Sequence, residues 1–133
     1  MNRKTIMILI CAGSLSLGAV IYLFSRPDAY VSILFSKIFH INRIQVLFPS
    51  IVSYYIPDFL WAVSLCSGLI ALVPIKWNVI WGILTALYGV LWEGLQFICA
   101  VNGTADIIDI IMYLSAAISV VMINYFIKMR EEK

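Results

Sequence analysis

The sequence predicts an all-α polytopic membrane protein with four transmembrane helices and an interfacial amphipathic helix between the first and the second. Of its 133 residues, 63% are hydrophobic and only 12% are charged, whereas a soluble domain carries about 25% charged residues. This bias extends along the whole chain, so we expect one transmembrane domain, 1–133, without a separate soluble module. The apolar runs lack the alternation of β-strands, and in lipid only helices or closed barrels satisfy the backbone, so helices are expected.

Four apolar segments approach the roughly 20 residues that a helix needs to cross a hydrocarbon core of about 30 Å. They cover residues 5–25, 57–73, 77–99 and 107–127. The first run is longer than the roughly 7–15 apolar residues of a signal peptide, and no cleavage site of small residues follows it, so we expect it to be retained. Pro57 suits the first turn of the second span, where its missing N–H is harmless.

The basic residues predict the orientation of the four spans, which place both termini on the same side. Those on that side are Arg3, Lys4, Lys76, Lys128, Arg130 and Lys133, and those on the opposite side are Arg26, Lys37 and Arg43. The excess on the side of the termini predicts that both termini are cytoplasmic.

The connection over 26–56 is the long one, and this orientation makes it extracytoplasmic. Ser32, Ser36, His40 and Arg43 recur at helical spacing on one face, with apolar residues around the rest. That pattern predicts an amphipathic helix in the membrane interface, and the segment 30–48 could serve as a lid. The other two connections are short, which predicts an antiparallel bundle of the last three spans.

Five polar residues lie at the edges of the apolar segments, and the topology brings them to the outer face of the membrane. They are Asp58, Glu93, Gln96, Asp106 and Asp109. Glu93 is the most costly, because it lies inside the third span, and an ionisable residue there usually has a functional role. A shared proton or a bound divalent cation would relieve the repulsion between the carboxylates.

Structural explanations for the same residues stay open. Asp106 and Asp109 have the spacing of acidic residues that cap a helix N-terminus, and Asp58 could cap the second span in the same way. Gln96 could form a hydrogen bond between helices. His40 stands alone on a polar face, which is typical of a solvated interfacial histidine.

At these residues the chain resembles the VanZ-like family of small bacterial membrane proteins. The resemblance covers roughly 57–120 and is carried by Asp58, by Glu93-x-x-Gln96 and by Asp106-x-x-Asp109. Trp61 and Tyr113 stand where many members have histidine and asparagine. The resemblance implies a multi-pass protein of the bacterial cytoplasmic membrane with an envelope role, and the prototype is associated with resistance to the glycopeptide antibiotic teicoplanin.

Together the residues and the resemblance favour a pocket at the outer face that binds the head group of a membrane lipid or glycolipid. The candidate binding residues are Asp58, Trp61, Glu93, Gln96, Asp106, Asp109 and Tyr113. Trp61 is expected at interface height, where aromatic rings settle, and would close the pocket wall with Asp58.

Two other classes of function stay open. Clustered carboxylates could bind a divalent cation in an enzyme that acts on a lipid-linked substrate, although no other cofactor is expected. Alternatively, the chain could be a structural or accessory subunit with a membrane-protein partner, or a homo-oligomer. A net charge of +2 and the absence of a basic stripe in the sequence argue against nucleic acid.

Overall fold

The structure is a computed structural model that describes residues 2–40, 46–101 and 105–131. Its elements are α1 (Arg3–Ser25), α2 (Tyr30–Phe39), α3 (Ser50–Leu72), the 3₁₀ turn η1 (Ile75–Trp77), α4 (Asn78–Phe97) and α5 (Ile107–Glu131). Within the described residues every element is helical, and α1, α3, α4 together with η1, and α5 are long and apolar enough to cross a membrane. The prediction of an all-α chain with four helices of membrane-spanning length is therefore confirmed.

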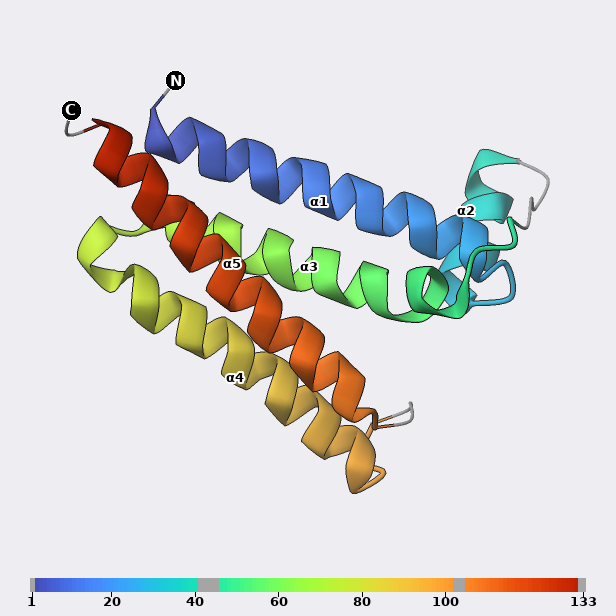
Figure 1. Cartoon of the computed structure of the whole chain (residues 1–133). Coiled ribbons are helices and arrows are strands. Elements are labelled where there is room, and N and C mark those ends of the chain that lie inside the picture. Colours follow the sequence, from blue (N-terminus) through green and yellow to red (C-terminus); the bar gives the residue numbers. More distant parts are fainter. Residues whose placement is uncertain (1, 41–45, 102–104, 132–133) are drawn as a thin grey trace.

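The long helices form an antiparallel bundle in which α5 contacts the three others (Figure 1). Helix α1 packs along α3, and α5 packs against both α3 and α4. Helices α3 and α4 meet at the short turn around η1 and diverge from there (Figure 1). Both termini lie at the same end of the bundle. We call the opposite end, where α3 and α5 begin and α4 ends, the distal end.

Small residues allow the helices to approach closely. A Cβ atom added at Gly68 of α3 would lie 3.1 Å from the Cys11 sulfur of α1. At the same contact, the Ser64 hydroxyl donates a hydrogen bond of 3.0 Å to the Cys11 carbonyl. On the other side of the bundle, a Cβ atom at Gly82 of α4 would lie 2.6 Å from Val121 of α5. Larger side chains at these glycines would force the helices apart.

Helix α3 begins at Ser50 rather than at 57, which corrects the predicted start of the second span. Pro49 is the N-cap residue, and its carbonyl accepts hydrogen bonds from the N–H groups of Val52 (2.9 Å) and Ser53 (3.1 Å). Pro57 is buried inside the helix instead of opening it. A proline inside a helix removes one hydrogen bond and bends the axis, and Figure 1 shows that the first turns of α3 point away from the rest of the helix.

The predicted amphipathic segment is only partly helical. Helix α2 ends at Phe39, and His40 follows in the left-handed conformation with φ of 52°, its N–H bonded to the Ser36 carbonyl. The lid predicted over 30–48 is therefore shorter than expected as a helix, and Arg43 lies outside the described residues. Ser32 is buried, whereas the apolar side chains on the other faces of α2 are exposed. The position of α2 in a membrane interface stays a prediction.

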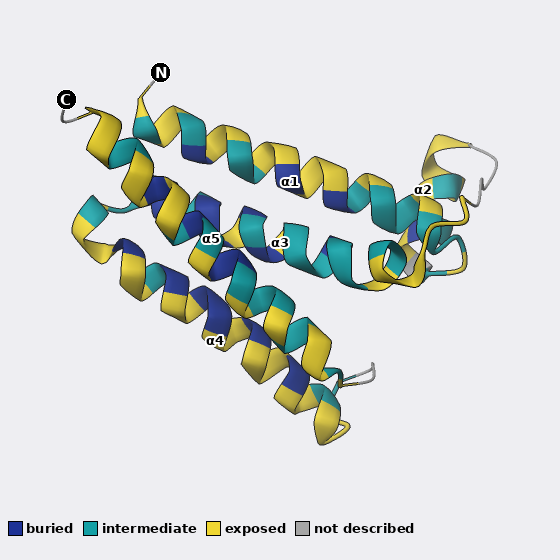
Figure 2. Ribbon diagram, viewed as in Figure 1, coloured by how far each residue is buried: buried dark blue, intermediate teal, exposed yellow. Residues whose placement is uncertain are grey.

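The surface of the bundle around the long helices is largely apolar. The buried core is small and consists of Met7, Cys66, Ile70, Ala71 and Val120 with their partly buried neighbours. Many large apolar side chains point outward instead, and Figure 2 shows exposed residues along the outer faces of α1 and α4. Soluble proteins rarely expose continuous apolar surfaces of this extent. The exposed surface therefore suits an apolar solvent.

At the end with both termini, the Arg3 side chain joins α1 to the other long helices. Its Nε donates to Asn124 Oδ1 at 2.7 Å, and its Nη2 donates to Asn78 Oδ1 at 2.9 Å and to the Ile70 carbonyl at 2.8 Å. Both asparagines are buried, and the Ile70 carbonyl lies in the last turn of α3, where helical partners are missing. Arg3 therefore connects all four long helices at this end.

Candidate functional site

A polar cavity of about 270 Å³ opens at the distal end of the bundle. It brings together the five polar residues that the sequence singled out. Its lining residues are Arg26, Tyr54, Tyr55, Asp58, Trp92, Glu93, Gln96, Asp106, Asp109 and Tyr113. The convergence follows from the fold, because α3 and α5 begin at this end and α4 finishes there.

Glu93 is the most buried carboxylate of the cavity, with only 3% of its surface exposed. Its Oε2 accepts a hydrogen bond of 3.0 Å from the backbone N–H of Asp106, just before α5 begins. The first N–H groups of a helix have no partner within the helix, and an acidic acceptor satisfies them and complements the helix dipole. Glu93 therefore ties the end of α4 to the start of α5.

Asp106 has the capping role that the sequence left open. Its Oδ1 accepts the N–H of Ile108 at 2.9 Å, which satisfies one of the free donors of α5. Its Oδ2 accepts the hydroxyl proton of Tyr55 at 2.9 Å, and this bond joins α5 to α3. Both carboxylate oxygens of Asp106 are thus engaged by the protein itself.

Asp109 differs from Asp106 because one of its oxygens is unsatisfied. Its Oδ1 is buried and has no hydrogen-bond partner among the described residues. Leaving a buried acceptor unpaired costs about 1–3 kcal/mol. Since Asp106 and Glu93 already engage N–H groups at the start of α5, Asp109 is free to receive a donor from the cavity.

Arg26 enters this cavity from the end of α1. Its guanidinium carbon lies 4.7 Å from the ring centroid of Tyr54 and 5.3 Å from that of Tyr22, so it stacks on two aromatic rings. Its Nε is buried and has no hydrogen-bond partner in the described part of the chain. The positive charge of the guanidinium attracts the carboxylates of Asp58 and Asp109. The site is therefore mixed in charge rather than purely acidic.

Asp58 and Gln96 complete the polar lining, and both are partly buried. Gln96 follows Glu93 by three residues on α4, so the two share a helical face. Asp58 lies one turn after Tyr55 on α3, well inside the helix that begins at Ser50. It therefore cannot cap α3, which was one of the structural roles considered from the sequence.

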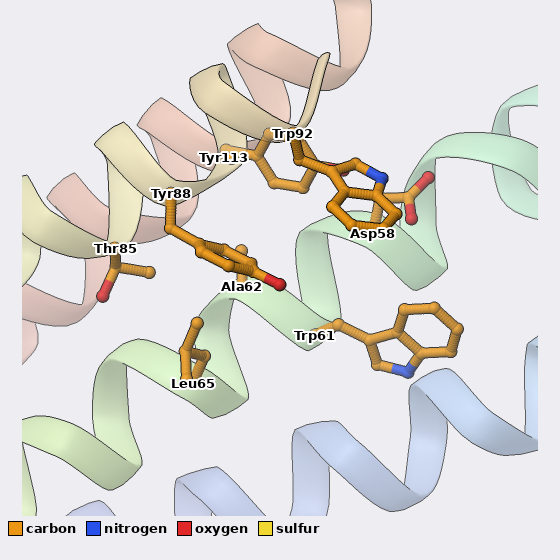
Figure 3. Close-up of a pocket in the computed structure, with 9 residues that line it drawn as sticks. Asp58, Trp61, Ala62, Leu65, Thr85, Tyr88, Trp92 and Tyr113 are labelled. Atoms are coloured by element: carbon orange, nitrogen blue, oxygen red, sulfur yellow. The ribbon is translucent and has the colours of Figure 1, made fainter. Parts of the chain in front are cut away.

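A second cavity, also about 270 Å³, adjoins the polar one between α3 and α4 (Figure 3). It shares Asp58, Trp92 and Tyr113 with the polar cavity. Its remaining lining residues are Trp61, Ala62, Leu65, Thr85, Tyr88 and Gly89. Apart from Asp58 the walls are aromatic, aliphatic or small, so this is an apolar cavity that continues from a polar one.

Trp61 belongs to the apolar cavity and does not line the polar one, where the sequence placed it. Its ring lies on the side facing α1 (Figure 3). There it packs against Gly18, where an added Cβ atom would be 2.9 Å from the indole, and its centroid is 5.2 Å from that of Tyr22. Trp61 therefore positions α1 against α3 as well as walling the apolar cavity.

Tyr113 of α5 lies at the boundary of the two cavities, where its ring packs on the backbone of α4. A Cβ atom added at Gly89 would overlap with the Tyr113 ring and would be 2.8 Å from its Cβ. Glycine at 89 is thus needed for this close approach. On its polar side the Tyr113 hydroxyl interacts with the Glu93 carboxylate.

Three residues that line the polar cavity were not predicted as site residues from the sequence, although the position of each in the sequence could have indicated it. Tyr54 and Tyr55 precede Asp58 by about one helical turn, which becomes visible once the helix is extended through Pro57. Trp92 directly precedes Glu93. From the sequence Arg26 was considered only as a basic residue that bears on the orientation, and the structure places it in the cavity itself.

The carboxylates of the cavity also raise the question of a metal ion. Among the residues that the structure describes, no three His, Cys, Asp or Glu side chains are grouped so that they could hold one. The divalent cation considered from the sequence therefore stays a prediction.

By its fold the chain is a helical protein with four segments of membrane-spanning length, and its site is a mixed-charge cavity at one end of the bundle. Comparison of the chain with protein-family models, with curated proteins and with solved structures finds no match. The function is therefore argued from the site.

Proposed function

We propose that this protein is an integral membrane protein of the bacterial envelope whose polar cavity binds a lipid head group. The observation that carries the proposal is Asp109 Oδ1, a buried acceptor on the polar cavity that lacks a hydrogen-bond partner in the described chain. A buried acceptor without a partner costs about 1–3 kcal/mol, and an ionisable residue within a membrane-spanning helix usually faces the protein interior or a cavity with a function. A ligand that donates hydrogen bonds would offset that cost.

The proposed orientation follows from charge. The end with both termini carries more lysine and arginine than the distal end, so the termini are cytoplasmic and the cavity faces the outer leaflet. In that arrangement α2 lies in the outer interface, with Ser32 against the protein and its apolar side chains toward lipid. The head groups of the outer leaflet are then at the height of the cavity.

A structural role is the second candidate, and specific bonds support it. The Tyr55–Asp106 and Glu93–Asp106 hydrogen bonds join three helices without any ligand. An accessory subunit would need these bonds and nothing more. It would have no use for the unsatisfied oxygen of Asp109, and for that reason we favour binding.

The link to glycopeptide resistance rests on the resemblance to the VanZ-like family alone. If it holds, the bound lipid belongs to the cell envelope on which such antibiotics act. We therefore include susceptibility to teicoplanin as a secondary readout in a strain that expresses the protein.

The primary test is native mass spectrometry of the detergent-purified protein after incubation with a bacterial lipid extract. The variants are Glu93→Gln and Asp109→Asn, which keep side-chain size and remove a negative charge. Glu131→Gln makes the same change at the other end of the bundle and is the matched control. We expect a lipid that stays bound to the wild type and to the control and is lost from both cavity variants.

Two results would contradict the proposal. One is equal lipid retention by the wild type and both cavity variants. The other is a loss of thermal stability in Asp109→Asn with lipid retention unchanged, which would favour the structural role.

A further inference from the structure

We propose that the occupant is a phospholipid with a primary amine in its head group, and that one of its chains lies in the apolar cavity between α3 and α4. The inference rests on the proposed function and goes further, because it names the class of lipid and the path of its chain. It depends on the contact between two cavities and on two buried polar atoms that lack hydrogen-bond partners among the described residues.

The two cavities are arranged as a bilayer lipid would require. The polar cavity lies at the distal end, and the apolar cavity extends from it along α3, from Asp58 to Leu65. Seven residues of helix span about 10 Å, and one leaflet of the hydrocarbon core is about 15 Å thick. On α4 the same path runs from Trp92 back to Thr85. A lipid with its head in the polar cavity would therefore point its chain toward the middle of the membrane.

The apolar cavity is also accessible from the side. Helices α3 and α4 diverge toward the distal end (Figure 1), and α5 packs against both of them. Leu65 is 41% exposed and Tyr88 is 59% exposed, although both line the cavity. A lipid chain can thus enter from the bilayer between these two helices without passing through water.

The charge of the polar cavity favours a head group that carries a positive charge. Within the described chain its lining has four carboxylates, on Asp58, Glu93, Asp106 and Asp109, and the guanidinium of Arg26. With all of these groups ionised the cavity carries a net charge of −3. A purely anionic head group would be repelled by this field.

The two unsatisfied atoms narrow the choice to a zwitterion with a primary amine. Asp109 Oδ1 needs a donor, and Arg26 Nε needs an acceptor, within the part of the chain that is described. A primary ammonium supplies N–H donors, whereas a quaternary ammonium supplies none. A phosphate oxygen is a good acceptor for a guanidinium. Phosphatidylethanolamine carries both groups a few bonds apart.

The test compares three lipids with identical oleoyl chains, phosphatidylethanolamine, phosphatidylcholine and phosphatidylglycerol. Each is titrated into the detergent-purified full chain and its retention is measured by native mass spectrometry. We expect phosphatidylethanolamine to bind at least about tenfold more tightly than the other two, a difference on the scale of one lost charged hydrogen bond. Equal affinity for phosphatidylcholine would overturn the assignment of the amine.

The path of the chain is tested with Leu65→Trp, which fills the apolar cavity and leaves the polar lining unchanged. Leu87→Trp is the matched control, because Leu87 is a half-exposed residue of α4 that lines neither cavity. We expect an affinity loss of about tenfold or more in Leu65→Trp and none in the control. Unchanged binding by Leu65→Trp would overturn the position of the chain.

Glycerophosphoethanolamine, which has the head group without chains, separates the two levels of the proposal. Weak binding of this soluble probe that Asp109→Asn abolishes, together with tight binding of the whole lipid, is the expected pattern. Equal affinity for the probe and the whole lipid would show that the acyl chains contribute nothing to binding. The chain position in the apolar cavity would then be wrong, whereas the head-group site would stand. Failure of the wild type to retain any lipid would instead contradict the proposed function itself.

Discussion

The carboxylate of Glu93 accepts the backbone N–H of Asp106 at 3.0 Å, across the connection between α4 and α5. A residue near the end of one helix thus satisfies a donor at the beginning of the next. The bond makes Glu93 both a lining residue of the polar cavity and a structural contact. The choice of substitution at this position therefore decides which role an experiment tests.

Glu93→Ala should lower the free energy of unfolding by about 1–3 kcal/mol, because it leaves the Asp106 N–H without its buried acceptor. Glu93→Gln should lower it less, since the amide oxygen can still accept that bond. Thermal unfolding in detergent, followed by circular dichroism, measures both. If both variants unfold at the same temperature as the wild type, the bond has no structural weight.

Tyr55→Phe removes the hydroxyl that bonds to Asp106 and keeps the ring. We expect a loss of about 1 kcal/mol, the usual contribution of one hydrogen bond. Tyr54→Phe is the control, because the Tyr54 ring stacks on Arg26 while its side chain is largely exposed. In the same unfolding experiment Tyr55→Phe should be less stable than Tyr54→Phe. The reverse order of stability would argue against the Tyr55–Asp106 hydrogen bond as a link between α3 and α5.

Gly89→Ala should displace Tyr113, because the added methyl group would occupy the position of its ring. Overpacking of this kind costs about 1–3 kcal/mol, and it should weaken lipid binding because Tyr113 lines both cavities. The matched control is Gly94→Ala on the same helix, where an added Cβ meets nothing within 4 Å. It should be neutral or stabilise by up to about 1 kcal/mol. Equal behaviour of the two variants in unfolding and lipid titration would contradict this packing.

Arg3→Gln should loosen α1 from the bundle, because the guanidinium bonds to Asn78, Asn124 and the end of α3 are lost or weakened. Charged hydrogen bonds contribute about 1.5–3 kcal/mol each, so a loss of several kcal/mol is expected. Lys4→Gln removes an equal charge from an exposed neighbour and controls for the effect of charge on topology. Proteolysis and thermal unfolding of the two variants should differ strongly, and similar curves would disprove the role of Arg3.

The helices of membrane-spanning length follow from composition, because runs of apolar residues report directly on the length that lipid requires. The position of the acidic residues together at the distal end was equally predictable. Glu93 and Asp106 flank a short connection, and an antiparallel topology then brings Asp58 to the same end. Both inferences need the order of the helices and no knowledge of how the side chains pack.

The contacts that depend on three-dimensional packing were less accessible. The sequence predicted that the helix begins at Pro57, and this prediction left Tyr55 outside the helix. The structure instead continues the helix through Pro57, which is accommodated at a bend. Trp61 was placed by its height in the membrane, but its direction is decided by the space that Gly18 leaves on α1. Arg3 was interpreted only as a topological charge, since nothing local in the sequence identifies partners more than sixty residues away.

The Arg3–Asn124 bond also has a consequence for the order of biosynthesis. The two residues are separated by 121 positions, so at a synthesis rate of about 5–20 residues per second Asn124 is made roughly 6–24 seconds after Arg3. During that interval α1 exists without its last partner. The guanidinium can already bond through Nη2 to the Ile70 carbonyl and Asn78, whereas its Nε has to wait for α5. A ribosome stalled before Asn124 should therefore leave α1 packed on α3 with the Arg3 Nε unpaired, and the synthesis of Asn124 would complete this network.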